Sequence, residues 1–418
     1  MAPESVVEAK PVRSGRSEPP ALRLSHRAGE MQASPLRKLA AIAEERKRKG
    51  IRVYHLNIGQ PDLPTPPVVF ETIRALNQKT LSYAPSNGIP EALEAWQKYL
   101  THCGIAVDQK EIIVTAGGSE AIIFAMCAVC DAGDELIVFE PFYTNYNGFA
   151  TIANVVLRPV PLDIASGFHL PSAGAIERFI TKRTRGFLFC NPSNPTGTVY
   201  SREEVGTLVS LARQHGLFLL SDEVYREFTY EGTAHSIMSF PEVADQAILL
   251  DSTSKRFNVC GARIGALVSH NAEIVQTAFK FGMARLSVAT VEQHALVPLL
   301  SSPKQFTGPI AAEFRRRRDL VYDKLAEIEG VTYYKPEGAF YIVIGLPVKD
   351  SDHFARWLIE EYQHQNETVL LAPAQGFYAT PGKGLNEVRL AFMLNGEALE
   401  RSLVILREAL QTYSEKFR

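Results

Sequence analysis

Short apolar runs alternate with longer amphipathic segments through the middle of the chain. The runs Ile112–Thr115, Glu135–Phe139 and Gly186–Cys190 each have the length of a buried strand, and helix-like stretches separate them. Leu217–Leu220 and Ala247–Leu250 repeat this arrangement further along. Strands that alternate with helices are typical of a mainly parallel sheet with helices on both faces. We therefore predict an α/β fold with a doubly wound sheet.

Both ends of the chain show a similar pattern on a smaller scale. The spacing of apolar residues predicts a helix over residues 34–50, followed by a strand over 53–58. Near the other end we predict a helix over 313–329 and strands over 331–334 and 339–344. These segments predict a smaller α/β domain built from both chain ends.

The predicted division of the chain follows from these segments. A chain of 418 residues is long enough for two domains, each with its own core. We expect residues 61–305 to form the large domain, with 23–60 and 306–418 forming the small one. Residues 1–22 are polar and rich in Pro, Ser and charged residues, which predicts a mobile tail.

Composition narrows the class of protein. The formal net charge of -2 gives no reason to expect nucleic acid as a partner. No apolar run approaches the roughly 20 residues of a membrane span, and the N-terminal residues lack the apolar segment of a signal peptide. An odd number of cysteines without a dense framework favours a reducing compartment, so we expect a cytoplasmic protein.

The pair Cys127 and Cys130 has the spacing of a redox motif. It lies, however, within the apolar run 121–130, which predicts a buried helix, and no further ligand cluster accompanies it. We therefore predict that both cysteines are small core residues, and we expect no metal site.

Residues suited to binding a phosphate and a carbonyl group surround one lysine. Lys255 lies between Ser252 and Arg263, a hydroxyl and a guanidinium that together suit a phosphate. The lysine amine can bond to a carbonyl carbon. Gly118 and Ser119 open a helix directly after a strand, where free backbone N–H groups favour an anion.

Two charged residues interrupt apolar strand segments. Asp222 follows the run Leu217–Leu220, so its carboxylate would lie at a buried strand end, although an Asp there could also cap a turn. Arg389 interrupts an apolar strand near the C-terminus, where a buried guanidinium needs a bidentate anion. An arginine on a sheet edge is the alternative, and the sequence alone leaves both open.

Several short motifs follow one another along the chain: Gly59–Asp62, Tyr83–Pro90, Gly117–Ala121, Asn191–Gly197, Asp222–Tyr225, Ser252–Gly265, Pro336–Tyr341 and Arg389–Leu390. They occur in the order that is found in class I and II aminotransferases of fold type I, and from about Arg23 onward the chain resembles that family. Two positions depart from the usual pattern. Gln60 replaces the common Glu, and Tyr146 stands where aspartate-specific members often have His.

The resemblance implies pyridoxal 5′-phosphate (PLP) as cofactor and a role for each motif. Lys255 would bond to the cofactor and move a proton, Asp222 would pair with its ring nitrogen, and Tyr143 would stack on its ring. Tyr225 and Asn194 would bind its phenolic oxygen. The expected phosphate ligands are Gly118, Ser119, Ser252 and Arg263, with Tyr83 from the neighbouring subunit of a homodimer.

The same resemblance implies the reaction. It predicts a ping-pong transfer of an α-amino group from an amino acid to a 2-oxo acid, with aspartate/glutamate-like or broad specificity. Gly59, Asn194 and Arg389 would hold the substrate carboxylate. Arg285 is a candidate for a second substrate carboxylate across the dimer, with a surface or interface arginine as the alternative.

Other functions are compatible with parts of this pattern. A carbon–sulfur lyase or an aminocyclopropane-carboxylate-type synthase would use the same cofactor contacts. A PLP-binding regulator would need a DNA-binding segment, and the polar N-terminal residues are too few for one. A nicotinamide dehydrogenase is disfavoured because the chain has no G-x-G-x-x-G motif.

Overall fold

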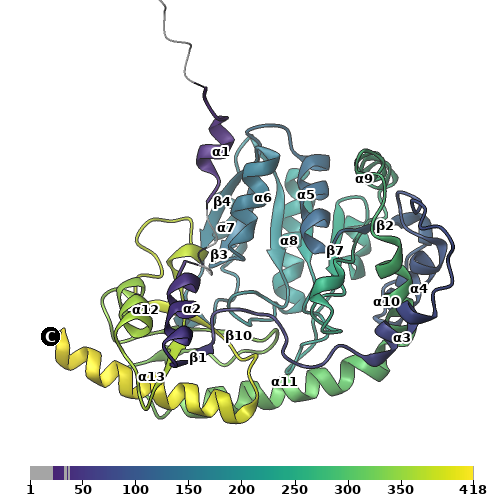
Figure 1. The fold of residues 1–418 in the computed structure, drawn as a ribbon. Coiled ribbons are helices and arrows are strands. Elements are labelled where there is room, and N and C mark those ends of the chain that lie inside the picture. Colours follow the sequence, from purple (N-terminus) through teal and green to yellow (C-terminus); the bar gives the residue numbers. More distant parts are fainter. Residues whose placement is uncertain (1–21, 33–34, 36–37, 418) are drawn as a thin grey trace, which may run out of the picture.

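The computed structural model describes residues 22–32, 35 and 38–417. The predicted mobile tail, residues 1–22, therefore lies outside the described residues except for its last position. A seven-stranded sheet forms the centre of the molecule, with strand order β2-β8-β7-β6-β5-β3-β4. Only β8 runs antiparallel to its neighbours. The predicted α/β fold with a mainly parallel sheet is confirmed (Figure 1).

The strands of this sheet coincide closely with the apolar runs of the sequence, because each run is a fully buried strand. They are β2 (Ile112–Thr115), β3 (Glu135–Glu140), β4 (Val156–Pro161), β5 (Thr184–Cys190), β6 (Phe218–Asp222), β7 (Ala247–Ser252) and β8 (Gly265–Val268).

Helices cover both faces of the sheet, since alternate side chains of each strand point to opposite faces. Leu188 and Leu220 pack with α5, α6 and α9 on one face, whereas Phe187 and Leu219 pack with α7 and α8 on the other. These helices are α5 (Gly118–Val129), α6 (Asn145–Ala153), α7 (Ala173–Glu177), α8 (Arg202–His215) and α9 (Ala272–Arg285). A further cluster joins α4 (Pro90–His102) and α10 (Thr290–Ser301), and α3 (Pro67–Ala75) contacts α10.

Segments from both chain ends share a second apolar core, which also includes a few residues of the central region, such as Tyr225 and Phe228. It contains residues such as Val53, Phe340 and Leu406. Figure 1 shows these segments together below the large sheet, with α11 extending along the base beside α13. The helices are α2 (Ala40–Arg48), α11 (Pro303–Leu325), α12 (Ser351–Glu360) and α13 (Gly396–Lys416), and α1 (His26–Glu30) lies apart from them.

Two small sheets belong to this second core. One pairs β1 with β11 in parallel, which brings residues 52–55 beside residues 367–370. The other has the order β12-β13-β10-β9. The strands are β1 (Arg52–His55), β9 (Thr332–Tyr333), β10 (Tyr341–Gly345), β11 (Glu367–Leu370), β12 (Ala372–Pro373) and β13 (Glu387–Ala391). Among the helices of the described residues, none is long and apolar enough to cross a membrane.

Some predicted boundaries are wrong for physical reasons. The helix predicted over 34–50 begins only at Ala40, and the strand predicted over 53–58 ends at His55. The helix predicted from 313 begins ten residues earlier, at Pro303, and includes Pro309. A proline removes only one helical hydrogen bond, and the buried contacts of Ile310 and Phe314 with the core offset that loss.

The prediction of a buried Cys127–Cys130 pair is also wrong. Cys127 is exposed and Cys130 is half-buried. Helix α5 is apolar on all sides, but it packs against the sheet only through the face that carries residues such as Ala121, Ala125 and Met126. Helical periodicity places Cys127 on the opposite face. Because α5 is apolar on all sides, its sequence does not indicate which face packs against the sheet.

A capping box forms the start of α8. The Ser201 hydroxyl accepts from the Glu204 backbone N–H, and the Glu204 carboxylate accepts from the Ser201 backbone N–H at 2.8 Å. The helix ends at Gly216, which has the left-handed conformation. These contacts satisfy helix-end groups that would otherwise lack partners.

We expect Ser201→Ala to lower the free energy of unfolding by about 1 kcal/mol, because one cap acceptor is lost. Urea unfolding of both proteins measures this difference. Ser210→Ala on the same helix is the control, since its hydroxyl bonds only to the Gly206 carbonyl within the helix. Equal unfolding midpoints for the two variants would contradict the assigned cap.

Candidate active site

A cavity of about 320 Å³ opens at the carboxyl ends of the central strands. Parallel sheets bind their ligands at this edge. The predicted site residues that line the cavity are Gly59, Gly118, Tyr143, Asn194, Asp222, Tyr225, Ser252, Lys255, Arg263 and Arg389. Ser119 and Tyr83 are not among the lining residues of this chain, and Tyr83 is 80% exposed.

Lys255 extends into the cavity from the loop that follows β7. Its amine donates to the Gly59 carbonyl at 3.0 Å and lies 3.9 Å from the Cys260 sulfur. Burial lowers the pKa of the Lys255 amine, and the cations Arg389 and Arg263 contribute in the same direction. A lowered pKa increases the fraction of neutral amine, which is the nucleophilic form.

A group of anion-binding residues forms one end of the cavity. Gly118 opens α5, and Ser252 lies beside it at the end of β7. The Arg263 guanidinium contacts the same turn, donating to the Ala116 carbonyl. A Cβ at Gly117 would lie 2.5 Å from an Arg263 nitrogen, and Gly117 has a φ of +79°. Only glycine therefore permits both this turn and the close approach of the guanidinium.

Asp222 lies at the buried end of β6. Tyr146 of α6 donates to one of its carboxylate oxygens at 2.8 Å, and the Val224 backbone N–H lies 3.4 Å from the other. Burial raises the pKa of Asp222 to about 7, against the effect of these hydrogen bonds. A buried carboxylate of this kind is stabilised when a cation binds beside it.

Arg389 belongs to β13 and is buried, with 1% of its surface exposed. It donates to Asn194 at 3.1 Å and to the Asn57 carbonyl, and its guanidinium lies 4.4 Å from the centre of the Tyr341 ring. Its Nε has no hydrogen-bond partner among the described residues. The alternative of an arginine on a sheet edge is therefore wrong, because Arg389 is buried and lines the cavity.

Tyrosine hydroxyls connect the remaining wall of the cavity. The Tyr225 hydroxyl oxygen lies 3.4 Å from the Asn194 amide nitrogen and 3.1 Å from the Tyr341 hydroxyl oxygen. A Cβ at Gly59 would lie 1.8 Å from that Tyr341 hydroxyl, so glycine makes room for the hydroxyl beside the segment that follows β1. Tyr143 packs edge-to-face on Tyr146, and burial raises the pKa of Tyr143 to about 12.

Sequence reasoning missed several lining residues. Tyr341 ends the motif Pro336–Tyr341, and this motif is the sequence feature that could have identified it as a site residue. Tyr146 was noted only as a departure, yet it binds Asp222 directly. Asn145 and Cys260 also line the cavity, and no pattern in the sequence distinguishes them.

Arg285 does not reach this cavity in its own chain. Its Nε lies 3.2 Å from Glu120, and its guanidinium also donates to the backbone carbonyls of Ser86 and Val114. These contacts join α9 to α5, to β2 and to the segment before α4. Within the described chain Arg285 is a structural ion-pair partner.

The residues of the cavity fit PLP. An anion-binding turn, a lysine amine and a buried carboxylate occupy separate parts of one cavity, which are the groups that a phosphate, an aldehyde and a cationic ring nitrogen require. The unpartnered Nε of Arg389 further provides a donor for a carboxylate. The donor set therefore matches both the cofactor and an amino acid.

Comparisons with known proteins agree with this chemistry. The family model "Aminotransferase class I and II" matches residues 51–384. A probable aspartate/prephenate aminotransferase of Thermus aquaticus is 33% identical, covering 93% of this chain and 99% of the relative. An aspartate aminotransferase of Geobacillus stearothermophilus is 29% identical, covering 91% of this chain and 97% of the relative.

Solved structures show the same architecture. A single mutant of Thermus thermophilus aspartate aminotransferase superimposes with a TM-score of 0.85 at 30% identity, covering 93% of this chain and all of that one. An alanine aminotransferase of Pyrococcus furiosus also gives a TM-score of 0.85, at 27% identity and 93% coverage of this chain. The chain belongs to the class I and II aminotransferase family, and it is a transaminase. Members of this family depend on PLP.

The pKa of Asp222 leads to a test on the protein without cofactor. Because its folded-state pKa of about 7 lies above the ordinary 3.8, its contribution to stability is complete below pH 3.8 and is lost as the pH rises through about 7. Between pH 5 and 8 we expect the loss to be about 2–3 kcal/mol.

The Asp222→Asn variant has no titratable group at this position, so it should not show this loss of stability between pH 5 and 8. Urea unfolding of both proteins across pH 5–8 measures it. Parallel stability curves for the wild type and the variant would contradict the raised pKa.

Proposed function

We propose that this transaminase holds PLP in the cavity described above and uses it to move an α-amino group from an amino acid to a 2-oxo acid. The observation that carries the proposal is the position of Lys255. Its amine lies in a buried cavity together with an anion-binding turn, the Asp222 carboxylate and the Arg389 guanidinium. When bound, the cofactor supplies an electron sink for the charge that develops on the substrate Cα.

Asp222 and Lys255 have complementary roles in this proposal. Asp222 holds a proton on the ring nitrogen, because a carboxylate in a buried site strongly favours a cationic partner. Lys255 would hold the cofactor through its amine. With substrate bound, the neutral amine would take the proton from the substrate Cα, and its lowered pKa suits this work as a general base.

The remaining cavity residues bind and orient. Gly118, Ser119, Ser252 and Arg263 are proposed phosphate ligands, and Tyr143 is proposed to pack against the ring. Tyr225 and Asn194 are proposed to bind the phenolic oxygen. Arg389, with Asn194 and Gly59, is proposed to hold the substrate carboxylate, which places the Cα next to Lys255.

We also propose a cytoplasmic homodimer with shared active sites. The high exposure of Tyr83 supports this, because a phosphate ligand supplied to a neighbouring subunit must project from its own chain. The apolar core that is built mostly from both chain ends supports the proposed division into a large domain, residues 61–305, and a small domain, residues 23–60 and 306–418.

The proposed substrates are an aspartate/glutamate-like pair or a broader set. Relatives named aspartate and aspartate/prephenate aminotransferases support this range. An alanine aminotransferase shares the fold equally well, so the architecture alone does not select the side chain. A panel of amino donors with 2-oxoglutarate, followed by glutamate formation, identifies the preferred donor.

The reaction type is tested by giving the PLP-loaded enzyme an amino acid without any oxo acid. We expect one 2-oxo acid per active site, with a stoichiometric loss of the visible cofactor absorbance, because a transaminase stops after one half-reaction. Continuing turnover with release of ammonia or another product would instead identify a lyase or a synthase.

Lys255→Ala is expected to lose the visible absorbance of the lysine-bound cofactor and to lower transamination by at least about 100-fold, since the general base is removed. Circular dichroism verifies that the variant is folded. The control is Lys349→Ala, which removes an exposed lysine in the turn before α12 and should change neither signal. Wild-type turnover by Lys255→Ala would refute the assignment.

Arg389→Lys is expected to raise KM for the amino donor about 10- to 100-fold with little change in the cofactor spectrum. Lysine keeps the charge but loses the planar pair of donors that matches a carboxylate. Arg356→Lys on the exposed surface of α12 is the matched control. An unchanged KM in Arg389→Lys would remove this residue from the substrate site.

A further inference from the structure

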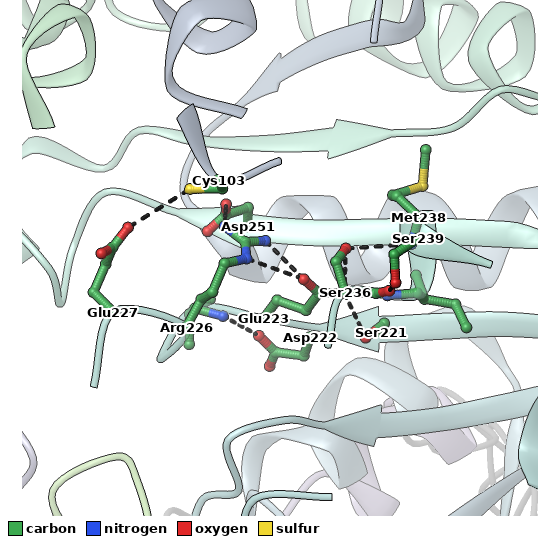
Figure 2. A network of polar contacts seen from close by, with 12 residues as sticks. Cys103, Ser221, Asp222, Glu223, Arg226, Glu227, Ser236, Met238, Ser239 and Asp251 are labelled. Carbon is green, nitrogen blue, oxygen red and sulfur yellow. Dashed lines mark hydrogen bonds and ion pairs between the residues drawn. The ribbon is translucent and has the colours of Figure 1, made fainter. Parts of the chain in front are cut away.

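A cluster of buried charges lies directly behind the candidate active site. Arg226 stands between two carboxylates, 2.8 Å from Glu223 and 3.1 Å from Asp251. Arg256 pairs with the other oxygen of Asp251. The Asp251 and Arg256 side chains are fully buried, and Glu223 is 2% exposed. Figure 2 shows Glu223, Arg226 and Asp251 converging beside the strand that ends at Asp222.

Each member of this buried charge cluster is the chain neighbour of a proposed cofactor ligand. The neighbouring pairs are Asp222 with Glu223, Tyr225 with Arg226, Ser252 with Asp251, and Lys255 with Arg256. Asp251 and Ser252 are consecutive residues of β7, and successive side chains of a strand point to opposite sides. The other three pairs lie at or beyond the ends of β6 and β7, and in each pair one residue lines the cavity while the other does not. The cluster therefore lies just behind the backbone from which the proposed ligands extend.

Asp251 has the most direct connection to this backbone. Besides its two guanidinium partners, it accepts from the Ser252 backbone N–H at 2.6 Å. One side chain thus joins the end of β7 to Arg226, after β6, and to Arg256, beside Lys255. Displacement of the Asp251 carboxylate would therefore move both Ser252, a proposed phosphate ligand, and the Lys255 amine.

Other contacts fix the edges of the cluster. Glu223 accepts from the Ser221 and Ser236 hydroxyls and from the Ile237 backbone N–H. Tyr99 of α4 accepts from Arg226 at 3.0 Å and donates to Glu227 at 2.8 Å. The cluster therefore connects the strand ends to a helix of the large domain.

Stability alone is a poor explanation for such a cluster. Removing charges from water costs free energy that their mutual attraction often fails to recover, and apolar residues of similar size commonly stabilise a fold as well or better. A buried charge cluster does, however, demand one geometry, because every member must keep its partners. That property suits residues that must hold catalytic groups in place.

The cluster and the carboxylate beside it carry a net charge. Its two carboxylates and two guanidiniums balance, and the Glu227 carboxylate, which accepts from Tyr99 beside the cluster, adds one negative charge. Asp251 and Glu223 both raise the pKa of Asp222. The other titratable or charged groups that face Asp222 or the same cavity are Tyr146, Tyr143, Cys190, Tyr225, Lys255, Cys260, Arg263, Tyr341 and Arg389.

We infer that Asp251 is a positioning residue: it holds Arg226 and Arg256 in the buried charge cluster, which fixes the strand ends carrying Asp222 and Ser252 and keeps negative charge behind Asp222. This inference rests on the proposed function, because the residues that Asp251 positions are those proposed to bind PLP. Asp251 itself does not line the cavity, so it acts through its neighbours.

The test compares Asp251→Asn with the wild type, both loaded with PLP. Loss of the charge should lower the pH midpoint at which the visible absorbance of the bound cofactor titrates, by about one unit. The dissociation constant for PLP should rise about tenfold or more, because Ser252 and Lys255 are less firmly held. We expect kcat to fall, while KM for the amino donor changes little, since Arg389 is untouched.

Asp251→Glu separates charge from geometry and also serves if Asp251→Asn fails to fold. It keeps the negative charge, so the pH midpoint should stay near that of the wild type. Its longer side chain cannot keep the contact with the Ser252 N–H, so PLP binding should still weaken. Wild-type PLP binding in Asp251→Glu would overturn the positioning role.

Val205→Ala is the control for general destabilisation. Val205 is fully buried in α8, among apolar residues on one face of the sheet, and it does not line the cavity. It should lower the melting temperature without moving the pH midpoint. An equal shift in Val205→Ala, or no shift in Asp251→Asn, would overturn the inference. Absence of any visible absorbance when PLP is added to the wild type would instead overturn the proposed function.

Discussion

The register of three parallel strands is the constraint on which the candidate site depends. In β5, β6 and β7 the positions Cys190, Asp222 and Leu250 lie side by side, so these strands end at nearly the same level. The Asn191 N–H bonds to the Asp222 carbonyl, and the Glu223 N–H bonds to the Leu250 carbonyl, which extends the pairing to the strand ends. Loops that leave the sheet at one edge can therefore bring Asn194, Asp222 and Lys255 into one cavity.

Burial gives these groups their chemical properties. Asp222 has a raised pKa, and Lys255 and Arg389 have lowered ones, each because burial penalises the charged form. Such desolvation destabilises the protein without ligands, and a cofactor or substrate of opposite charge would offset it. The buried charged groups that destabilise the ligand-free protein are thus the groups that bind ligands of opposite charge. This combination is common at functional sites.

Much of this arrangement could be predicted from the sequence, and the misses have clear physical origins. Strands such as Ile112–Thr115 were predictable because full burial makes a continuous apolar run. Helix α11 was mispredicted because Pro309 signals a break locally, whereas the packing of Phe314 decides otherwise. The exposure of Cys127 was missed because an apolar helix does not indicate which face is covered. Tyr146 was not expected to bind Asp222, because no local pattern connects residues so distant in the chain.

The sequence by itself determined the α/β order, the lysine segment and the residue types that PLP chemistry requires, since these depend on local periodicity and on motifs within a few residues. Only the tertiary structure decided that Arg389 is buried in the cavity, that Arg285 is paired with Glu120, and that Asp251 joins Arg226 to Arg256. These contacts join segments that are far apart in the chain. Their formation depends on strand register and on the packing of both chain ends against the large sheet. No single segment of the sequence determines either of these.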